Sequence, residues 1–213
     1  MTLAATLDFR SFVAGRLRSE PPGFTEPRSD LKGDHAFDPD DPMWAGRPPP
    51  RPAAVLVPVV THPEGATFLL TERAAHLRSH SGQIAFPGGR VDPEDRSPID
   101  AALREAEEEI GLDRSWVQPL GYLDAYLSGS NFFVLPVVAA VQPGFRLTIN
   151  ADEVADAFEV PVSFLMDEAN HAIHSREWNG AMRRYYAMPF ADRYIWGVTA
   201  GILRNMYERL YAR

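Results

Sequence analysis

Residues 104–112 read REAEEEIGL, and they follow the tetrapeptide FPGG at residues 86–89. The longer segment carries four glutamates, and the shorter one ends in two glycines. A dense run of negative charge is typical either of a solvated helix face or of a site for hard cations. The surrounding residues decide between these two interpretations.

Residues 98–110 are predicted to form a helix whose ends are both marked by suitable residues. Ser97 can cap the N-terminus, and Pro98 suits the first turn. Asp100 is three residues after the cap and can reach back to the backbone N–H of Ser97. Gly111 is a natural terminator.

The predicted helix has one apolar and one acidic face. At about 100° per residue, the apolar residues fall within roughly a 100° arc. These residues are Ile99, Ala102, Leu103, Ala106 and Ile110. Glu105, Glu108 and Glu109 cluster on another side, where each like-charge pair costs about 0.2–0.5 kcal/mol. A bound Mg²⁺ or Mn²⁺ would relieve this repulsion, but spacing alone supports an exposed glutamate-rich face about as well.

The glycine pair shifts this balance toward a functional site. A strand-like segment at 83–86 leads into Gly88 and Gly89, which allow a sharp turn and a close approach of the backbone to a ligand. A strand, a glycine loop and an acidic helix in succession favour a site for phosphate and metal.

The rest of the chain indicates a mixed sheet covered by helices, of class α/β or α+β. Residues 53–60 and 66–73 are predicted strands joined by a turn that contains Pro and Gly. Further strands are expected at 83–86, 117–125, 132–141, 172–178 and 183–188, and further helices at 6–18, 163–167 and 194–211.

We predict two parts, residues 1–50 with an N-terminal helix and a proline-rich arm, and residues 51–213 as the main domain. The arm is dense in Pro, Gly and Asp and shows no periodicity. At about 30 residues it is too long for an ordinary internal loop, so it either packs across the domain or contacts a partner subunit. The arm and the aromatic helix near the C-terminus hint at a homodimer.

Composition excludes several classes of function. The net charge of −8, from 21 basic and 29 acidic residues, gives no overall attraction to nucleic acid or to an anionic membrane. The absence of cysteine excludes disulfides, thiolate nucleophiles and Cys-ligated metal centres. No apolar run reaches the roughly 20 residues of a membrane-spanning helix, and no secretory signal begins the chain, so we expect a cytoplasmic location.

Gly89, Asp95 and the segment 104–112 together resemble the Nudix box, the signature of hydrolases that act on nucleoside diphosphates linked to another moiety. The general pattern has Glu at the position of Asp95 and one residue fewer before the Arg-Glu pair. The resemblance implies a Nudix α/β/α sandwich with a mixed β-sheet.

A second motif narrows the resemblance to one branch. Residues 69–89, LLTERAAHLRSHSGQIAFPGG, are similar to the additional motif of the coenzyme A pyrophosphatases. Ala74 stands where that motif usually has Ser, so the role of that hydroxyl is lost or supplied elsewhere. The branch implies metal-dependent hydrolysis of the pyrophosphate bond of coenzyme A or acyl-CoA, which yields adenosine 3′,5′-bisphosphate and (acyl-)4′-phosphopantetheine.

The resemblance also implies roles for residues in the box. By matching positions, Glu105 and Glu109 are the expected ligands of Mg²⁺ or Mn²⁺. Glu108 is expected to be a third ligand or to orient the attacking water. Arg104 is expected to pair with a nearby carboxylate and fix it.

Residues outside the helix complete the expected site. Glu153, in a loop after the box, is the candidate general base or additional metal ligand. Arg73 and Arg78 are candidates for binding the 3′-phosphate, while Gly88 and Gly89 would approach the substrate. A further candidate, a charged and stacking surface for adenine, comprises Arg183, Arg184, Tyr185 and Tyr186.

Two other functions stay open. One is the same chemistry on another nucleoside diphosphate derivative, such as ADP-ribose. The other is a non-catalytic nucleotide-sensing module that kept the Nudix fold. The presence of Glu105, Glu108 and Glu109 argues against the second, because a site without a metal has no reason to tolerate their mutual repulsion.

Overall fold

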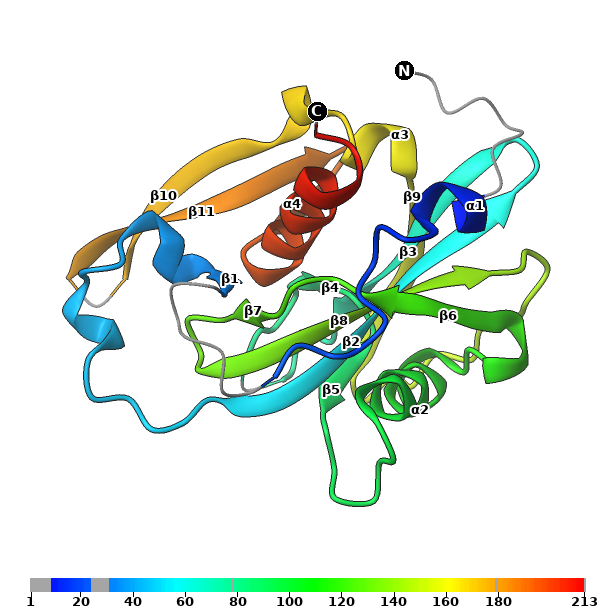
Figure 1. The fold of residues 1–213 in the computed structure, drawn as a ribbon, viewed down its shortest axis with the longest axis horizontal. Helices are drawn as coiled ribbons and strands as arrows, with labels where there is room; N and C mark the ends of the chain where they lie inside the picture. Colours follow the sequence, from blue (N-terminus) through cyan, green and yellow to red (C-terminus); the bar gives the residue numbers. More distant parts are fainter. Residues whose placement is uncertain (1–8, 24–30, 78, 179, 213) are drawn as a thin grey trace.

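A computed structural model describes residues 9–23, 31–77, 79–178 and 180–212. Within these residues the main sheet comprises β1 Lys32–Gly33, β2 Arg51–His62, β3 Gly65–Arg73, β4 Ile84–Ala85, β5 Gly88–Arg90, β6 Val117–Tyr122, β7 Tyr126–Leu127, β8 Phe132–Val141 and β9 Val154–Pro161. The strand order is β1-β7-β8-β2-β3-β4, and β5, β6 and β9 pair with β2, β8 and β3 (Figure 1). The sheet is mixed, because β2 runs parallel to β8 and antiparallel to β3.

A second, antiparallel sheet has the order β10-β11-β12, with β10 Ala172–Trp178, β11 Ala181–Phe190 and β12 Arg193–Trp196. The α-helices are α1 Phe9–Val13, α2 Pro98–Ile110, α3 Val162–Leu165 and α4 Val198–Leu210, and short 3₁₀ helices are η2 Asp34–Phe37, η3 Pro42–Trp44, η4 Arg114–Trp116 and η5 Glu168–Asn170. In the described part of the chain, no helix combines the length and the apolar character needed to cross a membrane.

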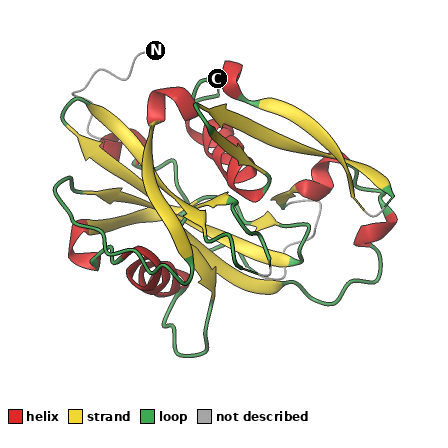
Figure 2. Ribbon diagram, turned by 180° about the vertical axis from the view of Figure 1, so that it is seen from behind, coloured by secondary structure: helices red, strands yellow, loops and turns green. Residues whose placement is uncertain are grey.

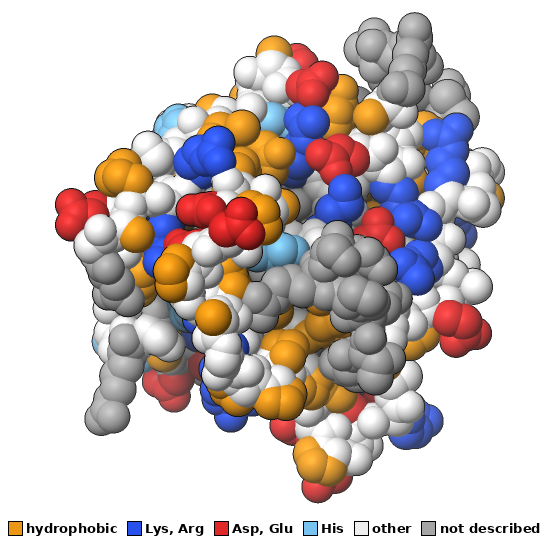
Figure 3. Space-filling model, turned by 60° about the vertical axis from the view of Figure 1, so that its left-hand side comes forward, with side chains coloured by type: hydrophobic (Ala, Val, Ile, Leu, Met, Phe, Trp, Pro, Cys, Tyr) orange, Lys and Arg blue, Asp and Glu red, His pale blue; other side chains and the backbone are white. Residues whose placement is uncertain are grey.

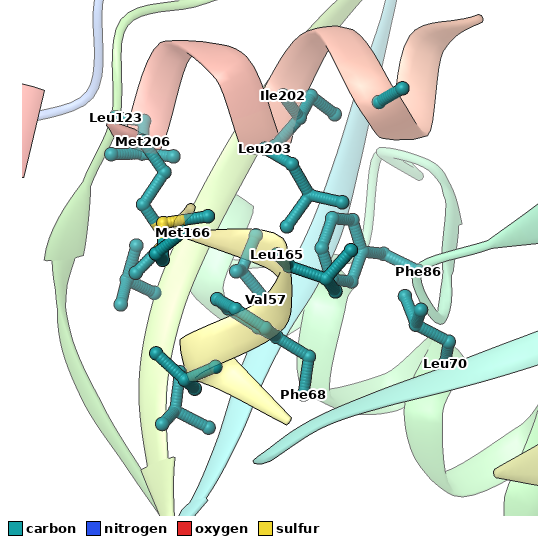
Figure 4. Close-up of a cluster of buried hydrophobic side chains, with 14 of the residues drawn as sticks. Val57, Phe68, Leu70, Phe86, Leu123, Leu165, Met166, Ile202, Leu203 and Met206 are labelled. Carbon is teal, nitrogen blue, oxygen red and sulfur yellow. The ribbon is translucent and has the colours of Figure 1, made fainter. Parts of the chain in front are cut away.

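Helices α2 and α4 cover opposite faces of the main sheet (Figures 1 and 2). Strand β2 is buried on both faces because successive side chains alternate between them. Val57 and Val59 join the core on the α4 side, whereas Leu56 and Val60 join the core under α2. Figure 4 shows the α4 side, where Ile202, Leu203 and Met206 lie over Val57 and Phe68 of the sheet. This three-layer arrangement confirms the predicted fold class.

Local sequence signals locate α2 correctly at Pro98–Ile110. The Ser97 hydroxyl accepts the N–H of Asp100 at 3.1 Å, and Gly111 ends the helix in the left-handed conformation at φ 64°. The predicted contact of Asp100 with Ser97 is wrong. The Asp100 carboxylate accepts from the Nε and backbone N–H of Arg96, because the Arg96 side chain reaches it as an ion pair.

The predicted helix over 194–211 is wrong at its start. Residues 193–196 form β12, which pairs with β11, and α4 begins only at Val198. Gly197, at φ 63°, turns the chain between the two elements. Pairing with β11 outweighs the helical pattern here, because local propensity is weaker than tertiary packing. The strand expected at 117–125 likewise ends earlier, at Tyr122. Within the helix expected at 6–18, α1 covers Phe9–Val13.

Residues 31–50 of the arm pack across the main domain. Strand β1 pairs in parallel with β7, and Asp41 forms an ion pair with Arg183 of β11. The Asp34 carboxylate accepts the Tyr126 hydroxyl at 2.6 Å and the N–H of Gly129 at 2.9 Å. Residues 31–50 thus pack across the domain, which is one of the two arrangements expected for the arm.

Candidate active site

The glycine loop and α2 meet through β5. Gly88 and Gly89 lie opposite Val55 and Ala54 of β2, and the N–H of Gly88 donates to Glu109 Oε2 at 3.1 Å. A Cβ at Gly88 would lie 2.5 Å from the Ala54 carbonyl oxygen, and one at Gly89 would lie 2.5 Å from the Glu105 carboxylate. Gly89 therefore allows the Glu105 carboxylate to lie directly against the loop, whereas Gly88 allows the loop to lie against β2.

Glu109 is an unusual group for its position, since its side chain is only 4% exposed. Burial raises the pKa of Glu109 to about 7, although the bond from Gly88 and the charge of Arg73 oppose this shift. Arg73 Nη1 lies 3.7 Å from Glu109 Oε1. The negative charges of Glu105 and Glu153 add to the rise, so three carboxylates influence one another here.

Glu105 shows the same behaviour to a smaller degree. Burial raises its pKa, and the charges of Glu108 and Glu153 add to the rise, against a bond from Arg104. Glu108 is half exposed and accepts from Arg104 Nη1 at 2.9 Å. Glu153 stands in the turn before β9, where its Oε1 accepts from Asn150 at 3.2 Å. The structure thus brings all four predicted carboxylate positions to one region between α2 and this turn.

Arg104 connects the loop before α2 to the acidic face of the helix. Its Nε and Nη2 bind the two oxygens of Asp95, each at 3.0 Å, and this pairing lowers the pKa of the Asp95 carboxyl. Its Nη1 donates to Glu105 at 3.0 Å and to Glu108. Asp95, which replaces the family's usual glutamate, therefore still provides a two-point contact that holds this guanidinium.

The donors fit a divalent cation in their chemistry. Glu105, Glu109 and Glu153 offer carboxylate oxygens, which are the preferred ligands of Mg²⁺ and Mn²⁺. A cation would favour the charged forms of Glu105 and Glu109, whose pKa values are raised by burial first and by neighbouring carboxylates second. Among the residues that the structure describes, no three His, Asp or Glu side chains already converge in metal-binding geometry. In this arrangement Arg104 and the N–H of Gly88 hold the individual carboxylates instead.

A cleft of about 1000 Å³ opens beside the glycine loop. Its walls come from the arm, from the main sheet and from the small sheet β10–β12. Gly88, Gly89 and Arg73 line one part, and Trp178 and Trp196 line another. Figure 3 shows hydrophobic side chains in a hollow on the side of the molecule that carries the arm. The cleft can hold an extended ligand with one end at the glycine loop, and Glu105 and Glu109 lie against that loop.

The predicted adenine surface at 183–186 is not a single surface. Arg183 pairs with Asp41 of the arm, and the Arg184 guanidinium binds the carbonyl oxygen of Phe37. Tyr185 contacts Trp196 in the cleft wall, whereas Tyr186 packs on Phe37 and against Arg204. Neighbouring residues of a strand point to opposite faces, which separates the two tyrosines. Arg78 lies outside the described residues.

Three residues of the cleft wall that the sequence did not single out lie together. Arg51, Arg90 and Phe132 come from three different strands, and both guanidiniums lie over the Phe132 ring. Arg90 directly follows the glycine pair and could have been singled out on that ground. Nothing local marks Arg51 or Phe132, because only the pairing of β2 with β8 brings them together.

The mixed three-layer sandwich, the glycine loop and the acidic helix define a hydrolase of phosphoric anhydrides. The NUDIX domain model matches residues 50–179, and the chain belongs to the Nudix family of pyrophosphohydrolases. Nudix hydrolases generally need divalent metal ions, typically Mg²⁺ or Mn²⁺.

The chain is similar to curated proteins called "Uncharacterized Nudix hydrolase NudL". Those of Yersinia pestis (strain Pestoides F) and Yersinia pseudotuberculosis serotype O:1b (strain IP 31758) are each 41% identical over 160 residues, which is 75% of this chain and 80% of theirs.

Two solved structures show similarity to the fold. The NUDIX domain of Shewanella oneidensis NrtR, complexed with ADP ribose, has 17% identity and a TM-score of 0.48, covering 80% of this chain and 98% of that chain. A C. elegans Ap4A hydrolase binary complex has 20% identity and a TM-score of 0.45, covering 52% of this chain and 80% of that chain.

Proposed function

We propose that the protein hydrolyses the pyrophosphate bond of coenzyme A or acyl-CoA with Mg²⁺ or Mn²⁺. The products are adenosine 3′,5′-bisphosphate and 4′-phosphopantetheine or its acyl derivative. The observation that carries the proposal is the position of the motif at 69–89. This segment runs from β3 through β4 to the glycine loop, and its Arg73, Gln83, Phe86 and Gly88 line the cleft next to the acidic helix.

The carboxylates of α2 are the proposed metal ligands. Glu105 and Glu109 would hold the ion, with Glu108 as a third ligand or as the residue that orients water. When bound, a divalent ion supplies charge neutralisation on the pyrophosphate and activation of water. Arg104 positions Glu105 and Glu108, because one guanidinium nitrogen binds both carboxylates while the rest of the group is anchored on Asp95.

The remaining residues act on the substrate and on the proton. Glu153 would accept the proton of the water that attacks one phosphorus. Arg73 would neutralise phosphate charge, since its buried Nε has no hydrogen-bond partner among the described residues and is free to donate to a ligand. Gly88 and Gly89 allow the pyrophosphate to approach the backbone.

The size and lining of the cleft suit coenzyme A. A volume of about 1000 Å³ is at the upper end of the range for small-molecule sites, as a long substrate requires. Apolar and aromatic side chains dominate the wall away from the glycine loop, among them Met182, Trp178 and Trp196. Such a wall suits the pantetheine arm and an attached acyl chain better than it suits a second sugar phosphate.

Product analysis by chromatography tests the proposal. The protein is incubated with Mn²⁺ or Mg²⁺ and, in parallel, with coenzyme A, dephospho-coenzyme A and ADP-ribose. We expect adenosine 3′,5′-bisphosphate from coenzyme A and much weaker turnover of the other two. Preferential cleavage of ADP-ribose would keep the metal site and overturn the substrate assignment. Silence on all three would favour the nucleotide-sensing module.

A further inference from the structure

We propose that Arg51 and Arg90, stacked on Phe132, bind a phosphate monoester on the substrate's ribose and make the enzyme selective for nucleotides that carry it. The inference rests on the proposed function only in naming coenzyme A as the nucleotide.

The three residues form one group on one face of the sheet. Arg51 of β2 lies directly opposite Phe132 of β8, and Arg90 of β5 lies opposite Ala53 of β2. Positions 51 and 53 share a face because side chains alternate along a strand. The Arg51 guanidinium lies 4.1 Å from the centre of the Phe132 ring, and the Arg90 guanidinium lies 5.9 Å from it. All three residues line the cleft.

Neither guanidinium has an acidic partner in the part of the chain that the structure describes. Two other arginines of the cleft wall do form ion pairs, Arg73 with Glu109 and Arg183 with Asp41. Among the described residues, the structure shows no ion pair for Arg51 or Arg90. In a chain of net charge −8, two uncompensated cations beside one ring provide a local site for an anion.

The position of the pair fits a second phosphate close to the pyrophosphate. Arg90 directly follows Gly89, and successive residues of a strand are about 3.3 Å apart. A 3′-phosphate is separated from a 5′-diphosphate only by the ribose carbons, so its binding group must lie within a few ångströms of the glycine loop. Two guanidiniums match a phosphate dianion in charge and in donor geometry.

The turn that precedes β8 supports the group. The N–H of Arg51 donates to the carbonyl oxygen of Asn131 at 3.0 Å, and the Ser128 hydroxyl accepts the N–H of Phe132 at 3.0 Å. The hydroxyls of Ser128 and Ser130 are 3.0 Å apart, and both residues line the cleft. Ser128 is buried, so Ser130 is the residue of the two that can add a neutral donor, and its carbonyl oxygen lies 3.5 Å from Arg51 Nη2.

The test compares substrates that differ only in the 3′-phosphate. We would measure kcat/KM for coenzyme A and for dephospho-coenzyme A in the parent, in Arg51→Gln and in Arg90→Gln. The matched control is Arg146→Gln, which removes the same charge from an exposed residue outside the cleft wall. We expect the coenzyme A to dephospho-coenzyme A ratio to fall about tenfold in each cleft variant and to stay unchanged in the control.

Calorimetric titration with adenosine 3′,5′-bisphosphate and with AMP separates this inference from the proposed function. Tighter binding of the bisphosphate, weakened in both cleft variants, would support the phosphate site even if no coenzyme A were hydrolysed. The inference fails if the parent does not prefer the 3′-phosphorylated ligand, or if both variants keep the parent's preference while coenzyme A is still cleaved.

Discussion

At the residue scale, the two glycines of the loop have different tasks. A side chain at Gly88 would meet the backbone of β2 first, whereas the atoms nearest to one at Gly89 belong to the carboxylate of Glu105. Gly88→Ala should therefore lower the free energy of unfolding by about 1–3 kcal/mol. Gly89→Ala should leave the melting temperature nearly unchanged and reduce hydrolysis on the order of 100-fold, because it displaces a proposed ligand. Thermal unfolding and kcat/KM separate the two effects, and equal losses of stability would contradict this account.

Glu109 should make the stability of the metal-free protein depend on pH. Its pKa is raised by burial to about 7 in the folded chain, from an ordinary value near 4.5. Folding then favours the protonated form, so the stability it contributes is fully present below about pH 4.5 and is lost as the pH rises through 7. In EDTA, the parent should lose on the order of 2 kcal/mol between pH 5.5 and pH 8.

Denaturant unfolding of the parent and of Glu109→Gln at several pH values measures this contribution. The variant cannot ionise, so its stability should change less over the same interval. Parallel curves for the two proteins would mean that Glu109 is not the buried titrating group.

At the scale of the element, α2 presents its glutamates to different surroundings. Glu105 and Glu109 face the glycine loop. Glu107 does not line the cleft, and its carboxylate forms an ion pair with Arg114 at an N–O distance of 2.7 Å. Glu105→Gln and Glu109→Gln should each lower kcat/KM by at least about 100-fold, since each would remove a metal-ligand charge. Glu107→Gln, the matched control on the same helix, should retain most activity. A Glu109→Gln variant as active as the parent would show that the metal assignment is wrong.

At the scale of the whole molecule, the arm connects distant parts of the chain. Asp34 accepts from Tyr126 and Gly129, and the carbonyl oxygen of Gly129 accepts from Arg47 at 2.8 Å. The arm thereby holds the turn that precedes Phe132, so we regard it as part of the cleft wall. The division of the chain into residues 1–50 and residues 51–213 stays a prediction.

Asp34→Ala should test this role of the arm. The substitution leaves the buried Tyr126 hydroxyl without its acceptor, which should cost about 1–3 kcal/mol of unfolding free energy. Asp40→Ala changes an exposed carboxylate of the same arm outside the cleft wall and should have little effect. Differential scanning calorimetry compares the two, and equal melting temperatures would contradict a structural role for Asp34.

Local signals in the sequence were sufficient for much of the fold and of the acidic site. The ends of α2 depend on neighbouring residues, namely Ser97 and Gly111, and its faces depend on helical period. Long apolar runs located β2 and β8 because both strands are buried on two faces. The site residues proposed from the Nudix box lie together for the same local reason, since one loop and one helix carry most of them.

The sequence alone therefore determined the family, the acidic helix and the class of chemistry, because these depend on residues close together in the chain. Only the tertiary structure decided the cleft wall. The pairing of β2 with β5 and with β8 brings Arg51, Arg90 and Phe132 together. Arg183 forms its ion pair with Asp41, which lies 142 residues away in the sequence. Residues 194–196 became a strand for the same reason. Such contacts follow from strand pairing and packing over the whole molecule, which leave no periodic pattern in any single segment.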